Sequence, residues 1–508
     1  MSVHRTPRTA VTAAVLGVVL GLVLAGCSAG AGSTGTQPVE GEDELAVGLT
    51  AEPASLDFTT TDGAAIPEAL LYNVVETLVK VDAGTGDVVP LLAESYEVSA
   101  DGREYSFRLH EGVTFSNGDS FTAEDVAFSI ERVTSPAWTV SLKAAMDVVD
   151  EVEVVSPTEV VVRLSRPDDD WLYRMTTRIG GMFSETGVDD LANTPVGTGP
   201  YTVTGRTRGD SLTMAVRDDY WGEQPDVERV VLRYFEDGTA LENALVSGGI
   251  DVIGNLQTPE SLGRFRDDER FQVVEGTTNG ELVLSMGRRG PLQDLSLRRA
   301  VLHALDRQAL LDTTYAGTGE LIGSLVPPTD PWFDPALVQR YPYDPAGARE
   351  LLAGSAAPLP ELAFKIPSFP YAVNAAQVIA AQLAEVGVAA RIEVLEFAVW
   401  LDVVFTQHDF DLSLVAHVEP RDLAIFADPD YYFGYDSPRY RELLAEAATA
   451  DEQRAVQLRG EAAALLSEDA AAGFLFVLPN LMVAEVDVQG LPQNRVSESL
   501  DLTGVSRG

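Results

Sequence analysis

Segments with a two-residue hydrophobic period alternate with segments of a 3.6-residue period along most of this chain. The first pattern predicts strands, and the second predicts amphipathic helices. We expect strands over residues 45–50, 104–109, 148–155, 159–164, 211–216, 227–235 and 271–275. We expect helices over residues 67–80, 122–132, 239–247, 295–314, 344–353, 371–386, 437–449 and 452–469. A mixture of this kind over 508 residues predicts an α/β body of more than one lobe.

Charge and residue counts exclude several classes of protein. The sequence has 35 Lys and Arg against 78 Asp and Glu, a formal net charge of -43. It therefore lacks the clustered basic residues that bind a nucleic-acid backbone. One Cys and five His leave no CxxC pair, no zinc-finger spacing and no HExxH motif, and a GxSxG elbow and a P-loop are also missing. These absences favour a protein that is not an enzyme and needs no cofactor or metal ion.

The first 26 residues have the three-part layout of a secretory signal peptide, with Arg5 and Arg8 before an apolar run over 10–25. The run ends in Leu-Ala-Gly before Cys27, which resembles the bacterial lipobox, so Cys27 is expected to receive a lipid. The alternative is an ordinary signal peptide with an incidental cysteine. Residues 27–43 then form a polar Gly/Ser/Thr tether. We expect an extracytoplasmic protein whose one link to the membrane is this anchor on its outer face.

Several local motifs occur in order along the mature chain. They are EPASLD at 52–57, PLLAESYEVS at 90–99, GVTF at 112–115, TAEDV at 122–126 and VGTGPY at 196–201. Shorter ones follow at 220–221, 249–251, 299–300, 304–307 and 343–346. Together they resemble the extracytoplasmic solute-binding proteins of family 5, the class that delivers peptides, oligopeptides or nickel to ABC importers.

The resemblance implies a two-lobed periplasmic-binding-protein-like fold of type II, with an extra subdomain and a ligand cleft between the lobes. Lobe I would comprise residues 44–70, 191–275 and 485–508, with an inserted subdomain over 71–190. Lobe II would comprise residues 276–484. Crossing strands near 274–279 and 483–486 are the expected hinge, about which such proteins close on their ligand.

The segment 411–422 is expected to be a strand that runs into a polar loop. In the family, the corresponding strand commonly ends in an aromatic residue, and the following loop carries an Asp that holds a peptide's amino terminus. Here His417 stands near the aromatic position, Glu419 or Asp422 near the acid, and Arg421 between them. We expect these four residues to contact the ligand, with an ordinary surface position as the alternative for Asp422.

Two further groups are candidate ligand contacts. Thr278, Asn279 and Glu281 follow the end of a predicted strand, and the alternative for them is an ordinary turn. Trp400 and Tyr432 could wall the cleft or pack in the core, since buried aromatic residues are common in both settings. Phe58 lies in the opening segment, where the family's first-lobe contacts lie.

The resemblance also implies the partners, which are a peptide ligand and the permease subunits of an ABC importer, with a monomeric binding protein between them. One alternative within the family is a nickel-chelate or other small-solute binder, for which His408 and His417 are the candidate ligands. A second alternative is an extracellular enzyme or adhesin on the same scaffold. No nucleophile–base motif supports that second alternative.

Overall fold

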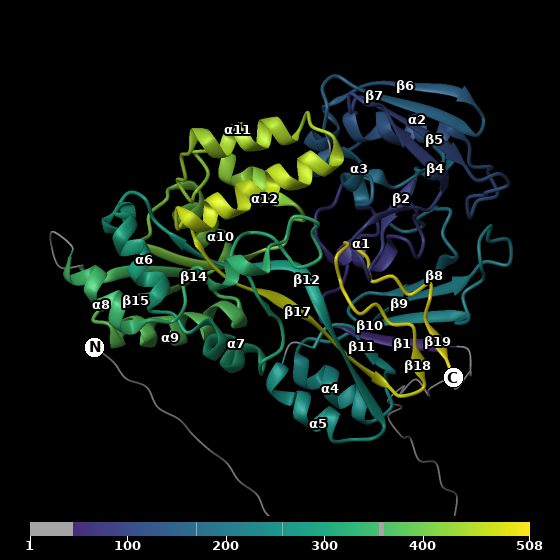
Figure 1. The fold of residues 1–508 in the computed structure, drawn as a ribbon. Coiled ribbons are helices and arrows are strands. Elements are labelled where there is room, and N and C mark those ends of the chain that lie inside the picture. Colours follow the sequence, from purple (N-terminus) through teal and green to yellow (C-terminus); the bar gives the residue numbers. More distant parts are fainter. Residues whose placement is uncertain (1–43, 169, 257, 355–359) are drawn as a thin grey trace, which may run out of the picture. The chain divides into compact units, whose positions relative to one another are not determined.

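The computed structural model describes residues 44–168, 170–256, 258–354 and 360–508 (Figure 1). The predicted signal peptide, the lipidated Cys27 and the tether lie outside the described residues. The described residues belong to one compact unit. In the part of the chain that is described, no helix is both long and apolar enough to cross a membrane.

The largest sheet is built around two long strands, β12 (Phe271–Met286) and β17 (Gly473–Glu485), which pair antiparallel along most of their length. On one side the order continues through β16 (Leu412–His417), β14 (Leu362–Pro367) and β15 (Ala390–Leu395). On the other side it continues through β11 (Val252–Ile253), β1 (Glu44–Leu49), β10 (Arg229–Tyr234), β9 (Ser211–Val216) and β8 (Tyr201–Thr207). The short β13 (Glu320–Leu321) also pairs with β17. Strands β12 and β17 therefore connect both halves of the sheet.

A second, four-stranded sheet lies within the predicted inserted subdomain. Its order is β4 (Ala93–Val98), β5 (Glu104–Leu109), β7 (Glu159–Leu164) and β6 (Val149–Ser156). Helix α2 (Ala123–Thr134) packs against this sheet. It starts with a capping box. The Thr122 side chain accepts a hydrogen bond from a main-chain amide of the first turn, and the Asp125 carboxylate accepts one from the Thr122 amide. A small hairpin of β2 (Val79–Val81) and β3 (Val88–Pro90) and the short α3 (Trp171–Arg174) complete this region.

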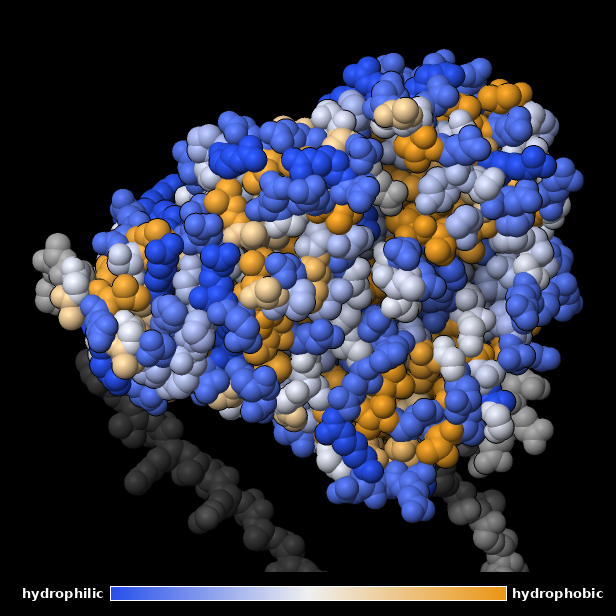
Figure 2. All heavy atoms as spheres, viewed as in Figure 1, coloured by the Kyte–Doolittle hydropathy of each residue, from blue (hydrophilic) through white to orange (hydrophobic). Residues whose placement is uncertain are grey.

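Helices cover the strands on the β16–β14–β15 side of the large sheet, the second half of that sheet. Hydrophilic side chains line two of these helices, α11 and α12, on the face that Figure 2 shows. The covering helices are α6 (Leu295–His303), α7 (Arg307–Tyr315), α8 (Pro345–Ala353), α9 (Pro370–Glu385), α10 (Phe397–Trp400), α11 (Pro438–Ala447) and α12 (Glu452–Glu468). Helices α1 (Ala65–Leu70), α4 (Gly238–Val246) and α5 (Leu262–Arg266), with the short strands β18 (Val488–Gln489) and β19 (Ser506–Arg507), belong to the first half.

Two predicted helices are wrong in part. The helix predicted over 295–314 is two helices, because the extended Asp306 interrupts it and its carboxylate caps α7 by accepting a hydrogen bond from the Ala309 amide. The helix predicted over 67–80 ends at Leu70. Tyr72 then has a left-handed backbone, and the chain continues as buried, β-branched sequence into β2.

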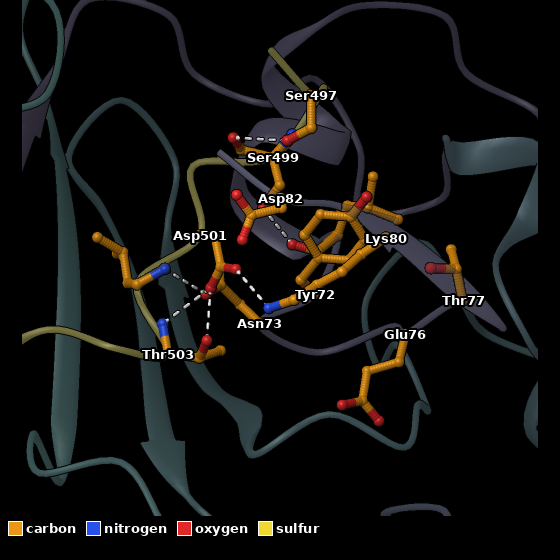
Figure 3. Close-up of polar contacts among 12 residues, drawn as sticks. Tyr72, Asn73, Glu76, Thr77, Lys80, Asp82, Ser497, Ser499, Asp501 and Thr503 are labelled. Carbon is orange, nitrogen blue, oxygen red and sulfur yellow. Dashed lines mark hydrogen bonds and ion pairs between the residues drawn. The ribbon is translucent and has the colours of Figure 1, made fainter. Parts of the chain in front are cut away.

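The C-terminal segment is tied to the chain that follows α1. The Asn73 amide nitrogen donates to the Leu500 carbonyl at 2.8 Å, and its oxygen accepts from the Leu502 amide at 3.0 Å. Lys80 Nζ lies 3.4 Å from the Asp501 carboxylate, and Figure 3 shows the Lys80 side chain reaching that group. The end of the chain is thereby held against the start of the first half.

We expect Asn73→Ala to lower the free energy of unfolding by about 1–3 kcal/mol, because it leaves buried main-chain groups of Leu500 and Leu502 without partners. Urea denaturation followed by tryptophan fluorescence measures this difference. The exposed Asn193 gives the matched control, and Asn193→Ala should change the midpoint little. Equal effects of the two substitutions would contradict this role for Asn73.

Candidate functional site

Charged side chains meet where β12 and β16 lie side by side. Glu281 on β12 is directly opposite His417 on β16, so their side chains are on the same face of the sheet. After His417 the chain turns through Arg421, whose backbone is left-handed at φ 57, into a 3₁₀ helix over Asp422–Ala427. This turn returns the Asp422 carboxylate to within 3.8 Å of His417 Nδ1.

One ligand atom each from His417, Glu419 and Asp422 lies within 4.8 Å of the other two. Together with Glu281, these residues form what we call the strand-end cluster: Glu281, His417, Glu419 and Asp422. Hydrogen bonds fix the imidazole at its centre, because His417 Nε2 lies 2.9 Å from the Tyr432 hydroxyl. That hydroxyl also accepts a hydrogen bond from Ser285 at 3.1 Å. The Nδ1 atom is therefore the one that faces the carboxylates.

Burial dominates the electrostatics of the cluster. Glu281 is 2 % exposed, and burial, with the nearby charge of Asp422, raises its pKa well above the ordinary value. Burial also raises the pKa of Asp422, and the charges of Glu419 and Asp330 add to the effect. Burial lowers the pKa of His417 to about 4, so the imidazole is neutral at pH 7. The site thus holds more carboxyl groups than it can ionise without a compensating positive charge.

One oxygen of this group has no protein partner. Glu281 Oε2 is buried and accepts no hydrogen bond within the described parts of the chain. A buried acceptor in this state costs free energy that a bound cation or hydrogen-bond donor would recover.

Arg421 extends from the same turn toward the first half of the chain. Its guanidinium carbon lies 4.0 Å from the centre of the Tyr173 ring and 5.1 Å from that of Trp332. Its Nε atom is 3.8 Å from the Asp330 carboxylate. Burial raises the pKa of Asp330 to about 7, and Arg421 opposes that shift.

A second arginine reinforces these contacts. Arg459 on α12 lies over the Trp332 ring at 4.6 Å and forms an ion pair with Asp170 at 3.0 Å. Asp170 and Tyr173 belong to the predicted inserted subdomain, whereas both arginines and Trp332 belong to predicted lobe II. The two parts of the chain are therefore joined beside the strand-end cluster.

The other predicted site residues are mainly held by hydrogen bonds and ring contacts within the fold. Asn279 donates to the Val496 carbonyl at 2.9 Å, and Thr278 donates to the Leu478 carbonyl at 2.7 Å. Trp400 donates to Ser413 at 3.0 Å, and its ring is 5.8 Å from that of Tyr432. Phe58 is 2 % exposed and packs against other buried aromatic rings. Of these five, Tyr432 alone contacts the cluster directly, through His417.

The sequence did not identify the residues that meet Arg421. Asp330 and Trp332 lie in the proline-rich stretch 327–335, for which no site residue was predicted. Asp170 and Tyr173 come from a segment more than 150 residues earlier in the chain. No local sequence pattern links two such distant segments.

His417 is the last residue of β16, whereas His408 lies before the start of that strand. The strand occupies Leu412–His417, and at about 3.3 Å per residue it spans about 16 Å. Burial lowers the pKa of His408, and the charge of Arg289, which lies beyond the far end of β12, lowers it further while that of Asp430 opposes the shift. The two histidines are therefore not placed to share one metal ion, as the nickel alternative had suggested.

Comparison with known proteins places this arrangement in a wider context. The chain matches the model of the bacterial extracellular solute-binding proteins, family 5 Middle, over residues 87–451. It is 28% identical over 377 residues to the dipeptide-binding protein of Escherichia coli (strain K12). The aligned region covers 68% of this chain and 69% of that protein.

Two solved structures show the same fold. One is the ABC transporter-associated periplasmic binding protein DppA from Helicobacter pylori in complex with the peptide STSA, with a TM-score of 0.74 and 23% identity over 91% of this chain and 98% of that one. The other is NikZ from Campylobacter jejuni in complex with Ni(L-His), with a TM-score of 0.73 and 19% identity over 92% of this chain and 100% of that one. The predicted α/β, two-lobed periplasmic-binding-protein fold is confirmed.

Replacement of Glu281 by glutamine should make the protein more stable at pH 8. The pKa of Glu281 is raised in the folded state, so its stabilising contribution is present below the unfolded value of 4.5 and is lost as pH rises. Glutamine cannot ionise and avoids this loss. We expect thermal midpoints of Glu281→Gln to exceed those of the wild type at pH 8, with a gap that narrows toward pH 5.

The exposed Glu159 provides a control for the loss of one negative charge, and Glu159→Gln should track the wild type. Thermal denaturation of all three proteins across this pH range is the measurement. A constant gap between Glu281→Gln and wild type at every pH would show that ionisation of Glu281 is not the cause.

Proposed function

The chain belongs to the bacterial extracellular solute-binding proteins of family 5, and from that premise we propose that it captures peptides outside the cell membrane and delivers them to the permease of an ABC importer. The proposed role of every site residue is to bind, without covalent chemistry. The similarity to the dipeptide-binding protein of Escherichia coli supports a peptide as the ligand.

The observation that carries this proposal is the excess of buried carboxyl groups in the strand-end cluster. A peptide's terminal ammonium brings one positive charge and three hydrogen-bond donors. Glu281 Oε2 is an acceptor without a partner, and Asp422 is buried beside it. Bonds between an ammonium and carboxylates are strong where water is excluded. The cluster therefore offers the surroundings that an amino terminus requires.

Arg421 supplies the opposite charge on the same loop. Its Nε atom is buried and makes no hydrogen bond to the described residues, while its guanidinium lies against Tyr173. A guanidinium binds a carboxylate through paired hydrogen bonds. We assign Arg421 to the carboxylate of the peptide, or to one of its backbone carbonyls. The loop that carries both Arg421 and Asp422 would then set the distance between this group of the peptide and its ammonium.

Hinge closure completes the proposed mechanism. Strands β12 and β17 run through both halves of the large sheet, and their register is irregular between Thr277 and Glu281. A local irregularity in paired strands bends them, which suits a hinge. Opening there would separate Arg421 from Tyr173 and Arg459 from Asp170, and so admit a ligand to the cluster. Closure would exclude water from the bound ammonium.

The proposal includes a lipid anchor at Cys27 after removal of a signal peptide. One lipid-modified cysteine and the polar tether of 27–43 would keep a monomeric binding protein close to its permease. The large excess of acidic over basic residues, 78 against 35 in the full chain, would keep the body of the protein off anionic lipid headgroups.

We expect peptides with a free amino terminus to stabilise the full-length protein, and N-acetylated versions of the same peptides to have no effect. At 100 times its dissociation constant, a ligand adds about 2.7 kcal/mol of stability. A thermal-shift series with a mixture of dipeptides and its acetylated counterpart measures this. Asp422→Asn should abolish the shift, Glu419→Gln should reduce it, and Glu159→Gln should leave it intact.

Equal stabilisation by acetylated peptides would contradict the ammonium role of the cluster. Full stabilisation of Asp422→Asn would contradict it as well. A shift caused by nickel with histidine, with none from any peptide, would favour the alternative cargo.

The anchor has a separate test in a bacterial host that processes lipoproteins. We expect the wild type to incorporate radioactive palmitate and to sediment with membranes, because Cys27 would receive the lipid. Cys27→Ser should do neither. Labelling that persists in Cys27→Ser, or its absence from the wild type, would contradict lipidation at this residue.

A further inference from the structure

We propose that three aromatic residues beside the strand-end cluster, Phe369, Tyr371 and Phe397, bind the side chain of the ligand's first residue and select peptides that begin with an aromatic residue. We call these three residues the aromatic shelf. The inference rests on the proposed function, because it names the class of peptide that the same site would take.

The carboxyl ends of three parallel strands place the shelf next to the cluster. Strand β14 ends at Pro367, directly opposite Leu395 at the end of β15. Strand β16 runs parallel to β14 and ends at His417. Phe369 follows β14 by two residues, and Phe397 follows β15 by two residues. Ligands of open α/β sheets bind outside the carboxyl ends of the strands, which is the edge where the shelf lies.

Tyr371 joins the shelf to the strand that carries His417. Its hydroxyl accepts a hydrogen bond of 3.2 Å from the amide of Ala416, the residue before His417. Neighbouring strands lie about 4.8 Å apart, so the loop after β14 is about one strand spacing from the end of β16. A peptide's first side chain is bonded to the same carbon as its ammonium group. An ammonium held by the cluster therefore brings that side chain within reach of the shelf.

The rings of the shelf form one continuous aromatic surface. The centre of the Phe369 ring is 5.7 Å from that of Tyr371, with the planes stacked at 20°, and 5.2 Å from that of Phe397. The buried Trp400 stacks on Phe397 at 5.8 Å, with 9° between the planes. Aromatic rings attract one another at such distances. A ligand ring placed on this surface would extend the same row of contacts.

Phe397 is open to solvent, unlike nearly every other phenylalanine. Its side chain is 42 % exposed, and Phe405 is the one other exposed phenylalanine among the described residues. An apolar surface left open beside a few polar groups is typical of ligand-binding grooves. A ligand side chain that covers Phe397 would remove apolar surface from water, which favours binding.

The surroundings of the shelf favour an uncharged side chain. The one polar atom of its three side chains is the Tyr371 hydroxyl, which is already hydrogen-bonded. The loops after β15 and β16 add the acidic Glu396 and Glu419, whereas the Arg421 guanidinium lies against Tyr173. An acidic side chain on the ligand would meet like charges there, which is unfavourable. We therefore expect a preference for Phe, Tyr or Trp, and discrimination against Asp and Glu, at the first position of the peptide.

Titration calorimetry of the full-length protein with the dipeptides Phe-Ala, Ala-Phe, Ala-Ala and Asp-Ala tests the proposal. We expect Phe-Ala to bind about tenfold or more tightly than Ala-Ala, because its ring is buried on the shelf. Ala-Phe should gain less, since its ring is on the second residue. Asp-Ala should bind more weakly than Ala-Ala.

Three variants locate the preference, which is measured as the ratio of the Ala-Ala to the Phe-Ala dissociation constant. Phe397→Ala should lower this ratio to about three or less, because the open ring is lost. Phe397→Tyr keeps a ring and should retain the ratio. Phe405→Ala is the matched control, since it removes a phenylalanine that is 37 % exposed and lies outside the shelf. Circular dichroism shows whether each variant is folded.

The outcomes separate this inference from the proposed function. Equal affinities of the wild type for Phe-Ala and Ala-Ala would overturn the shelf and leave peptide capture standing. Tighter binding of Ala-Phe than of Phe-Ala would overturn it too, as would a preference that persists in folded Phe397→Ala or disappears equally in Phe405→Ala. If none of the dipeptides binds, the proposed function fails and the shelf fails with it.

Discussion

The pairing of β12 with β17 is the constraint on which the rest of the structure depends. Its register runs from Phe271 opposite Glu485 to Leu284 opposite Gly473, so two strands carry the sheet from one half of the chain to the other. Every other strand of the large sheet is attached on one side or the other of this pair. Glu281 and the β16 partner of β12 are placed by the same pairing. The proposed hinge and the proposed binding site are therefore parts of one element.

The strand-end cluster shows how a site of this kind is kept at a cost to stability. Glu281 and Asp422 are buried together, and burial opposes the ionisation of both. Replacement of buried charged groups by well-packed hydrophobic residues of similar volume is often neutral or stabilising. Their retention is understandable when a cation from outside completes the site. The contacts of Arg421 with Tyr173 and of Arg459 with Asp170 lie beside the cluster, so the contacts that the proposed closure would make adjoin the proposed ligand site.

Local sequence patterns predicted most of the elements that they could specify. The strands over 104–109, 159–164 and 211–216 have the predicted bounds, and the capping residues at Thr122 and Asp344 begin helices α2 and α8. The region after Leu70 was wrong because its apolar residues are buried on all sides, so hydrophobic spacing did not reveal that the helix ends. Strand β17 was predicted only at its end, as the crossing strand near 483–486, since a continuous apolar run has no two-residue period.

The candidate site was predictable where it depends on one strand end and no further. His417, Glu419 and Asp422 are close in sequence, and the structure keeps them together. Glu281 joins them through strand pairing, which a single sequence does not display. Tyr173 and Trp332 reach Arg421 through the packing of distant segments. The most direct test of the account is a crystal structure of the full-length protein with a bound dipeptide. The account predicts the peptide's amino nitrogen within about 3 Å of the Asp422 or Glu281 carboxylate. A dipeptide enclosed elsewhere, with the strand-end cluster untouched, would contradict it.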